Sequence, residues 1–237
     1  MQDTSVVPAE VARFDALASR WWDPHGPMRP LHRMNPARIG WITERIAARF
    51  PDPGAVRVLD VGCGAGLAAE ALAKCGYRVL GIDAAGEAVG AARAHADGLD
   101  LALDYRAGTA EALLAEEARF PVITALEVIE HVADPDAFLR TLADLLEPGG
   151  LLFVSTLNRT RRSFVVAKLG AEYLLRLLPV GTHDWKKFVT PAELGAGLRR
   201  AGLTVADMAG MTPSPLTGGW RAGRDLAVNY IAMAQRP

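Results

Sequence analysis

The chain has 237 residues, of which 50% are hydrophobic and 22% are charged, a balance typical of a globular protein with a substantial core. Its net charge is −1 and it contains no long basic run, which argues against a nucleic-acid-binding protein. The two cysteines, Cys63 and Cys75, lack the spacing of a metal motif, so neither a disulfide framework nor a zinc site is expected.

The chain shows no sign of a targeting or membrane-spanning segment. Its first 20 residues carry scattered charges and no continuous apolar stretch, so no secretory signal is predicted. No segment reaches the roughly 20 uncharged apolar residues that a spanning helix needs. We therefore expect a cytoplasmic protein that at most lies on a membrane surface.

Residues 1–50 are predicted to form a helical extension. Apolar spacing indicates a short helix over 11–22, which the turn formers at 23–27 end. A second helix is expected over 35–50, where Ile39, Ile42 and Ile46 share a face and Pro36 suits the first helical turn.

From residue 56 onward, short apolar runs alternate with helical ones, a pattern that predicts a mostly parallel sheet. The predicted strands are 56–61, 77–83, 101–106, 120–126 and 151–156, with helices over 67–75, 86–95 and 135–146. Two further strands, 203–208 and 226–234, are connected through a loop at 212–223. The predicted fold class is α/β, a doubly wound, mostly parallel, seven-stranded Rossmann-like sheet with its ligand crevice at the carboxyl ends of the strands.

A glycine-rich loop follows the first of these strands. Gly62, Gly64 and Gly66 alternate between the strand and the next helix, where glycine allows a tight turn and a close approach of a ligand to the backbone. The dinucleotide pattern would need a third glycine at position 67, which is Leu67, so the spacing argues against a dinucleotide site. Asp83 closes the second strand, where its carboxylate can accept hydrogen bonds from two ribose hydroxyls.

This loop, the acidic strand end and the Glu147-Pro148-Gly149-Gly150 turn occur in the order found in class I methyltransferases, which the region 56–156 resembles. The resemblance implies that S-adenosylmethionine is the cofactor. It further implies that Gly62, Gly64 and Gly66 wrap its methionine half and that Asp60 faces its ammonium group. The alternative is a tight turn that binds nothing, with a solvated Asp83.

A narrower resemblance extends from about residue 14 to 235. The stretches that carry it are 19–23, 30–38, 155–159, 170–173 and 181–184. They resemble the ubiquinone-biosynthesis O-methyltransferase family, which implies methyl transfer to phenolic hydroxyls of polyprenyl catechol-type intermediates. The same resemblance assigns Arg38, Gly62, Asp83 and Leu126 to cofactor binding. A guanidinium can hold a carboxylate with two parallel hydrogen bonds, although Arg38 could instead be a solvated helix residue.

The resemblance suggests how the whole chain, 1–237, is divided as a single methyltransferase domain. After the extension at 1–50 we expect a cofactor-binding core at 56–156, a helical insert at 157–200 that forms the substrate and membrane region, and C-terminal strands at 201–237.

Glu127, Glu130 and His131 follow the fourth strand at positions i, i+3 and i+4. If that turn is helical, the three side chains share one face and could hold magnesium or manganese, a role to which the family resemblance also links this stretch. Such a cation would lower the pKa of a bound catechol oxygen. The alternative is that the two glutamates surround a pocket while His131 acts as the catalytic base or packs locally.

Residues 163–179 are strongly apolar, with Lys168, Glu172 and Arg176 four positions apart as their only charges. A helix there would either pack on the core or lie in a membrane interface, which would suit a polyprenyl substrate. A complex with other ubiquinone-biosynthesis proteins is also conceivable. Two other functions stay open: methylation of another small acceptor, and a cofactor-binding module without catalysis.

Overall fold

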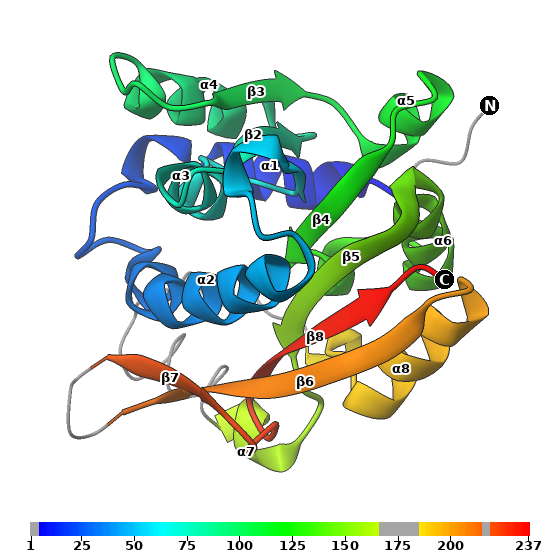
Figure 1. The fold of residues 1–237 in the computed structure, drawn as a ribbon. Coiled ribbons are helices and arrows are strands. Elements are labelled where there is room, and N and C mark those ends of the chain that lie inside the picture. Colours follow the sequence, from blue (N-terminus) through cyan, green and yellow to red (C-terminus); the bar gives the residue numbers. More distant parts are fainter. Residues whose placement is uncertain (1–4, 166–184, 215–218) are drawn as a thin grey trace.

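The computed structural model describes residues 5–165, 185–214 and 219–237. The described strands form one eight-stranded sheet in the order β3-β2-β1-β4-β5-β8-β6-β7 (Figure 1). The strands are β1 Arg57–Val61, β2 Arg78–Asp83, β3 Leu103–Ala107, β4 Phe120–Leu126, β5 Leu146–Leu157, β6 Thr204–Pro213, β7 Trp220–Gly223 and β8 Asn229–Gln235. The first five are parallel, and β8 runs antiparallel between β5 and β6.

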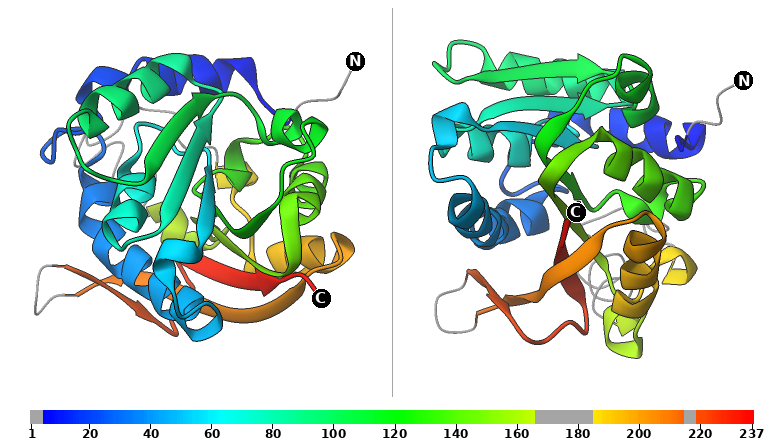
Figure 2. Two further views of the ribbon diagram at one scale, coloured as in Figure 1. Left: turned by 45° about the horizontal axis from the view of Figure 1, so that its top comes forward. Right: turned by 45° about the vertical axis from the view of Figure 1, so that its right-hand side comes forward.

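Helices cover both faces of the sheet, as Figure 2 shows from two sides. The described helices are α1 Pro8–Asp15, α2 Arg29–Arg49, α3 Leu67–Lys74, α4 Gly86–Ala96, α5 Ala110–Ala115, α6 Pro135–Leu145, α7 Arg161–Ser163 and α8 Pro191–Arg200. Successive strand residues point to opposite faces, so Val58 packs in the core under α2, α3 and α4, and Leu59 in the core under α5, α6 and α8. The predicted doubly wound fold is confirmed.

Three details of the prediction were wrong. The sheet has eight strands because β7 pairs with β6 inside the stretch 212–223 that was expected to be a loop. Helix α1 ends at Asp15, and the chain continues as the tighter 3₁₀ turn Ala18–Arg20. Helix α2 begins at Arg29, so Pro36 lies inside the helix instead of in its first turn. The sequence analysis also missed α5, which the Thr109 side chain caps.

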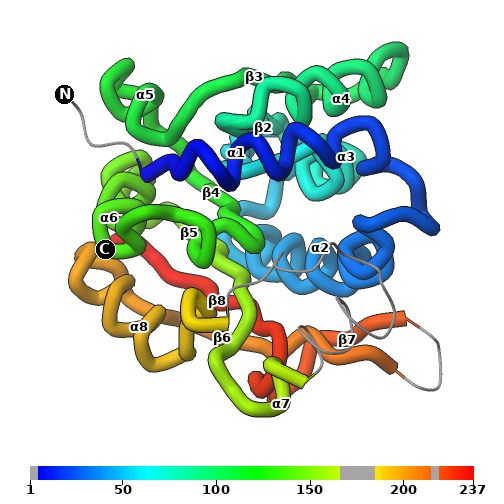
Figure 3. Tube along the Cα trace, turned by 180° about the vertical axis from the view of Figure 1, so that it is seen from behind, coloured from blue at the N-terminus to red at the C-terminus, as the bar shows by residue number. Residues whose placement is uncertain are grey.

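The N-terminal segment, residues 5–34, packs against the sheet and its connections. Seen from behind in Figure 3, α1 passes in front of β2 and β4. The Ser5 amide donates to Glu111 Oε1 at 3.0 Å, and the Ser5 carbonyl accepts from the Ala133 amide at 2.9 Å. The Trp22 indole donates to the Ala65 carbonyl and stacks on the His95 ring, with centroids 3.4 Å apart. These contacts fix the segment beside the glycine loop.

The predicted helix at 163–179 lies outside the described residues except for its first three positions. Two of these, Phe164 and Val165, are exposed. Within the described ranges, no helix is both long and apolar enough to cross a membrane.

Candidate active site

The glycine loop joins β1 to α3 in a conformation that requires glycine. Gly62, Gly64 and Gly66 have φ values of 69°, 54° and 90°, all in the left-handed region. A Cβ on Gly64 would lie 2.3 Å from Trp21 Cζ2, and one on Gly66 would lie 2.1 Å from Tyr105 Oη. The loop is therefore closely covered by aromatic side chains, and neither position can accept a larger residue without displacing them.

Asp83 connects the loop to the end of β2. Its Oδ2 accepts from the Gly64 amide and its Oδ1 from the Ala85 amide, both at 2.8 Å. Burial raises its pKa, while these two backbone donors lower it. Each carboxylate oxygen has a second lone-pair direction, so two ribose hydroxyls can still donate to Asp83. It is not the solvated residue of the alternative interpretation.

Two oppositely charged side chains are buried near the loop. Arg38 on α2 and Asp60 on β1 are only 3% and 2% exposed. Burial raises the pKa of Asp60 to about 6, against the hydrogen bond from Thr124 Oγ1 and the charge of Arg38. Burial also lowers the pKa of Arg38. Arg38 is thus not the solvated helix arginine that the sequence left open.

Neither of these buried groups is fully hydrogen-bonded within the described residues. Asp60 Oδ2 receives no donor there, and Arg38 Nε finds no acceptor, although its Nη2 donates to Asn35 Oδ1. An unmade hydrogen bond on a buried charge is costly. One orphan acceptor and one orphan donor match the ammonium and carboxylate of an amino acid, so these residues fit the methionine half of S-adenosylmethionine.

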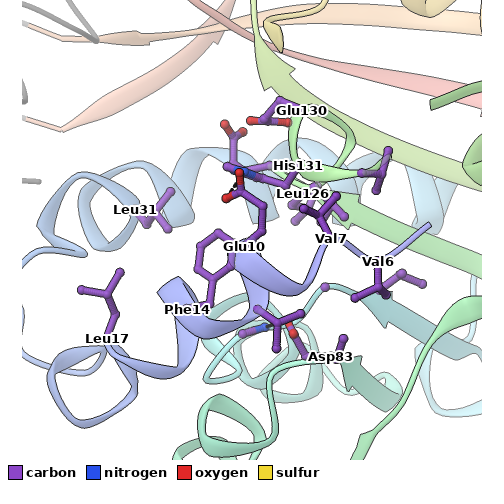
Figure 4. A pocket seen from close by; sticks show the side chains of 18 of the residues that line it. Val6, Val7, Glu10, Phe14, Leu17, Leu31, Asp83, Leu126, Glu130 and His131 are labelled. Carbon is purple, nitrogen blue, oxygen red and sulfur yellow. Dashed lines mark hydrogen bonds and ion pairs between the residues drawn. The ribbon is translucent and has the colours of Figure 1, made fainter. Parts of the chain in front are cut away.

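A cavity of about 440 Å³ extends from the glycine loop to the ends of β4, β5 and β8. Seven of the predicted site residues line it: Gly62, Gly64, Asp83, Leu126, Glu127, Glu130 and His131. Arg38, Asp60 and Gly66 do not. Figure 4 shows α1 contributing Glu10 and Phe14, with His131 and Glu130 at one end and Asp83 at the other. Most of the remaining wall is apolar.

Glu127 lines the cavity at the end of β4. Its φ of 59° is unusual for a residue with a side chain, and it follows β4 directly. Its Oε1 accepts from Ser155 Oγ at 2.6 Å, and both carboxylate oxygens lie 3.1 Å from Asn229 Nδ2. A left-handed non-glycine residue held by several partners is typical of a functional site.

Glu130 and His131 have partners of their own. Glu130 is 5% exposed, and Thr156 Oγ1 donates to its Oε2 at 2.9 Å. Burial, followed by the neighbouring charge of Glu127, raises the pKa of Glu130 to about 8. His131 Nδ1 lies 3.2 Å from Glu10 Oε2, and the Phe14 ring meets the imidazole edge to face at 5.2 Å.

The structure does not give Glu127, Glu130 and His131 the common helical face that the sequence analysis considered for them. The turn is not α-helical, because Glu127 has a left-handed backbone and Ile129–His131 form a 3₁₀ turn. The three side chains consequently turn to separate partners. Across the described ranges, no three His, Cys, Asp or Glu side chains are grouped so that they could hold a metal ion. These residues as placed do not fit a metal site.

Sequence reasoning missed Glu10 and Asn229, which both line the cavity. Glu10 lies 121 positions from His131 in the chain, and no spacing rule links them. Asn229 did carry a signal, because it is a polar residue within the apolar strand that was predicted at 226–234.

Comparison with known proteins supports the geometry. The model of a methyltransferase domain family matches residues 31–207. The fold is similar to that of magnesium protoporphyrin IX methyltransferase from Synechocystis PCC 6803 with bound S-adenosylmethionine, with a TM-score of 0.66 and 17% identity, covering 99% of this chain and 100% of that chain. Fold and site together define a class I S-adenosylmethionine-dependent methyltransferase.

Two curated relatives make the assignment narrower. The ubiquinone biosynthesis O-methyltransferase of a Cereibacter sphaeroides strain is 49% identical, covering 100% of this chain and 99% of the relative. The protein of the same description from Parvibaculum lavamentivorans is 49% identical, covering 98% of this chain and 95% of the relative. The chain belongs to the family of ubiquinone biosynthesis O-methyltransferases.

Proposed function

We propose that this O-methyltransferase transfers the methyl group of S-adenosylmethionine to a phenolic hydroxyl of polyprenyl catechol-type intermediates in ubiquinone biosynthesis. The observation that carries the proposal is one continuous cavity. It connects the cofactor loop and Asp83 to a histidine–carboxylate pair, His131 and Glu10, between largely apolar walls. An aromatic ring with an apolar tail fits such walls, and a phenol needs a base.

The buried polar residues hold the cofactor in this proposal. Arg38 takes its carboxylate, Asp60 its ammonium group and Asp83 its ribose hydroxyls, while the glycine loop admits the methionine part close to the backbone. When bound, the cofactor supplies an electrophilic methyl group on a sulfonium. Leu126, the last residue of β4, lines the same cavity.

His131 accepts the phenolic proton. If Nδ1–H donates to Glu10 Oε2, the other ring nitrogen carries the lone pair and can act as a base. The resulting phenolate oxygen forms a bond to the methyl carbon as the carbon–sulfur bond breaks. Apolar walls exclude water from this step, and positioning within the cavity supplies the in-line approach.

The test is methyl transfer to a short-tailed catechol, followed by mass spectrometry of the product. His131→Asn should lower kcat by about a hundredfold or more with cofactor affinity unchanged, because general bases typically contribute about 10²- to 10⁴-fold. The matched control is His25→Asn, an exposed histidine, which should leave kcat unchanged. Full activity of His131→Asn would remove the base assignment.

The divalent cation that the sequence predicted stays a prediction. In the same assay, a chelator should leave the rate unchanged if the side chains act as placed. Loss of activity in chelator, restored by magnesium or manganese, would instead require the three predicted ligands to rearrange around a metal.

Membrane association also stays a prediction. Phe164 and Val165, in the first three positions of the apolar stretch 163–179, are 36% and 55% exposed and support it. Co-sedimentation with anionic liposomes, with Phe164→Ser plus Val165→Ser as the weakened variant, measures it. The division into 1–50, 56–156, 157–200 and 201–237, and membership of a complex, are proposals of the same standing.

A further inference from the structure

Asn229 lines the cavity and carries an orphan hydrogen-bond acceptor. This first residue of β8 is 4% exposed, yet its Oδ1 receives no donor from the described residues. Its Nδ2 donates to the Glu127 carboxylate and lies 3.1 Å from both oxygens. An ionised carboxylate only accepts hydrogen bonds, so the amide nitrogen must face Glu127 and the amide oxygen must face the other way.

The position of Asn229 in the sheet indicates that its Oδ1 contacts the substrate that receives the methyl group, and not the cofactor. The glycine loop follows β1 and Asp83 ends β2, whereas β8 lies beyond β4 and β5 in the strand order. The neighbouring wall residues Leu157, Trp220 and Val228 are apolar. Oδ1 therefore lacks a hydrogen-bond donor, and a ligand with a hydroxyl group on an otherwise apolar ring would supply one.

We propose that Asn229 Oδ1 accepts a hydrogen bond from the ring hydroxyl next to the one being methylated, and so selects vicinal dihydroxy aromatics over monophenols. Glu127 is the positioning residue, because its carboxylate fixes the orientation of the amide and Ser155 Oγ in turn holds that carboxylate. The inference rests on the proposed function and adds the group that distinguishes a catechol from a phenol with the same tail.

The direct test is calorimetric binding of two probes, a short-tailed catechol and the monophenol with the same tail, in the presence of S-adenosylhomocysteine to prevent turnover. One additional hydrogen bond in a buried site should give the wild type roughly tenfold preference for the catechol. Asn229→Ala should reduce that preference to about one while S-adenosylhomocysteine affinity stays unchanged.

The matched control is Asn158→Ala. Asn158 is also a buried asparagine near these strand ends, but its Nδ2 donates to the Leu226 carbonyl and it does not line the cavity. This variant should keep the catechol preference even if it loses stability. A general packing effect would lower the preference in both variants and would overturn the proposal.

A second variant covers the case in which Asn229→Ala does not fold. Glu127→Gln keeps the size of the side chain, but its amide can donate to Oδ1 of a reoriented Asn229 and so occupy the acceptor. The catechol preference should fall in this variant too, and an unchanged preference would count against the inference.

The outcomes separate this inference from the proposed function. A wild type that methylates the catechol but binds both probes equally would refute the role of Asn229 alone, since solvent would then satisfy Oδ1. A wild type that binds S-adenosylhomocysteine but neither probe would refute the catechol acceptor, and the role of Asn229 with it.

Discussion

Asp60→Asn should stabilise the cofactor-free protein and weaken it as an enzyme. The substitution keeps the shape of the side chain and an oxygen that can accept from Thr124 Oγ1, but it removes a buried carboxylate with one unpaired oxygen. Burial raises the pKa of Asp60 from its ordinary 3.8 to about 6. Between these two pH values, the native protein therefore keeps a proton on Asp60 that the unfolded chain has already released.

The difference between the two pKa values gives the direction and the size of the pH dependence of stability. The contribution of Asp60 to stability is fully present below pH 3.8 and is lost as the pH rises through about 6. At about 1.4 kcal/mol per pH unit, the whole loss is about 3 kcal/mol, and about half of it falls between about pH 5 and pH 8. The free energy of unfolding of the wild type should decline over that interval by about 1.5 kcal/mol more than that of Asp60→Asn.

Urea unfolding of the cofactor-free proteins at several pH values measures this difference. Asp100→Asn, at an exposed aspartate, is the control and should follow the wild type. In the same preparations, S-adenosylmethionine affinity of Asp60→Asn should fall about ten- to a hundredfold because a charged partner of the ammonium group is lost. Parallel stability curves for the wild type and Asp60→Asn would refute the reasoning.

Three further predictions concern neighbouring residues. Asp83→Ala removes an acceptor for the ribose and should weaken calorimetric S-adenosylmethionine binding about ten- to a hundredfold; unchanged affinity would remove it from the cofactor site. Gly64→Ala places a Cβ 2.3 Å from Trp21 at a left-handed φ, so its thermal midpoint should fall and the cofactor should bind poorly, whereas Gly90→Ala, in open space on α4, should not lower the midpoint. Since the pKa of Glu130 is raised to about 8, its contribution is lost as the pH rises from 4.5 through about 8, and urea unfolding should show Glu130→Gln gaining stability over the wild type at about pH 9 relative to pH 6.

Much of the fold could be predicted because buried parallel strands are short apolar runs with turn formers on both sides. Phe120–Leu126 was predicted with the bounds that the structure has. The strand β7 could not be foreseen, since four residues are too short a run to show a strand pattern and they form a strand by pairing with β6. The 3₁₀ turn after α1 depends on packing rather than on local sequence in the same way.

The same distinction between local sequence and long-range packing decides which residues of the candidate site could be predicted. The glycine loop and Asp83 are local features, and the structure places them in contact as expected. The shared face of Glu127, Glu130 and His131 required a helical turn, and no sequence pattern reveals the left-handed backbone that Glu127 has instead. Glu10 and Asn229 come from distant parts of the chain, so only the topology of the sheet brings them to His131 and Glu127.

The N-terminal segment has a consequence for how the molecule assembles. Residues 5–34 precede every strand in the chain, yet several of their partners, among them Glu111, His131 and Ala133, lie more than a hundred positions away. Closing loops of more than a hundred residues is entropically slow compared with pairing neighbouring strands. The cavity should thus be completed after the sheet has formed, late on the folding pathway. Substitutions at these partners should accelerate unfolding while leaving the refolding rate almost unchanged.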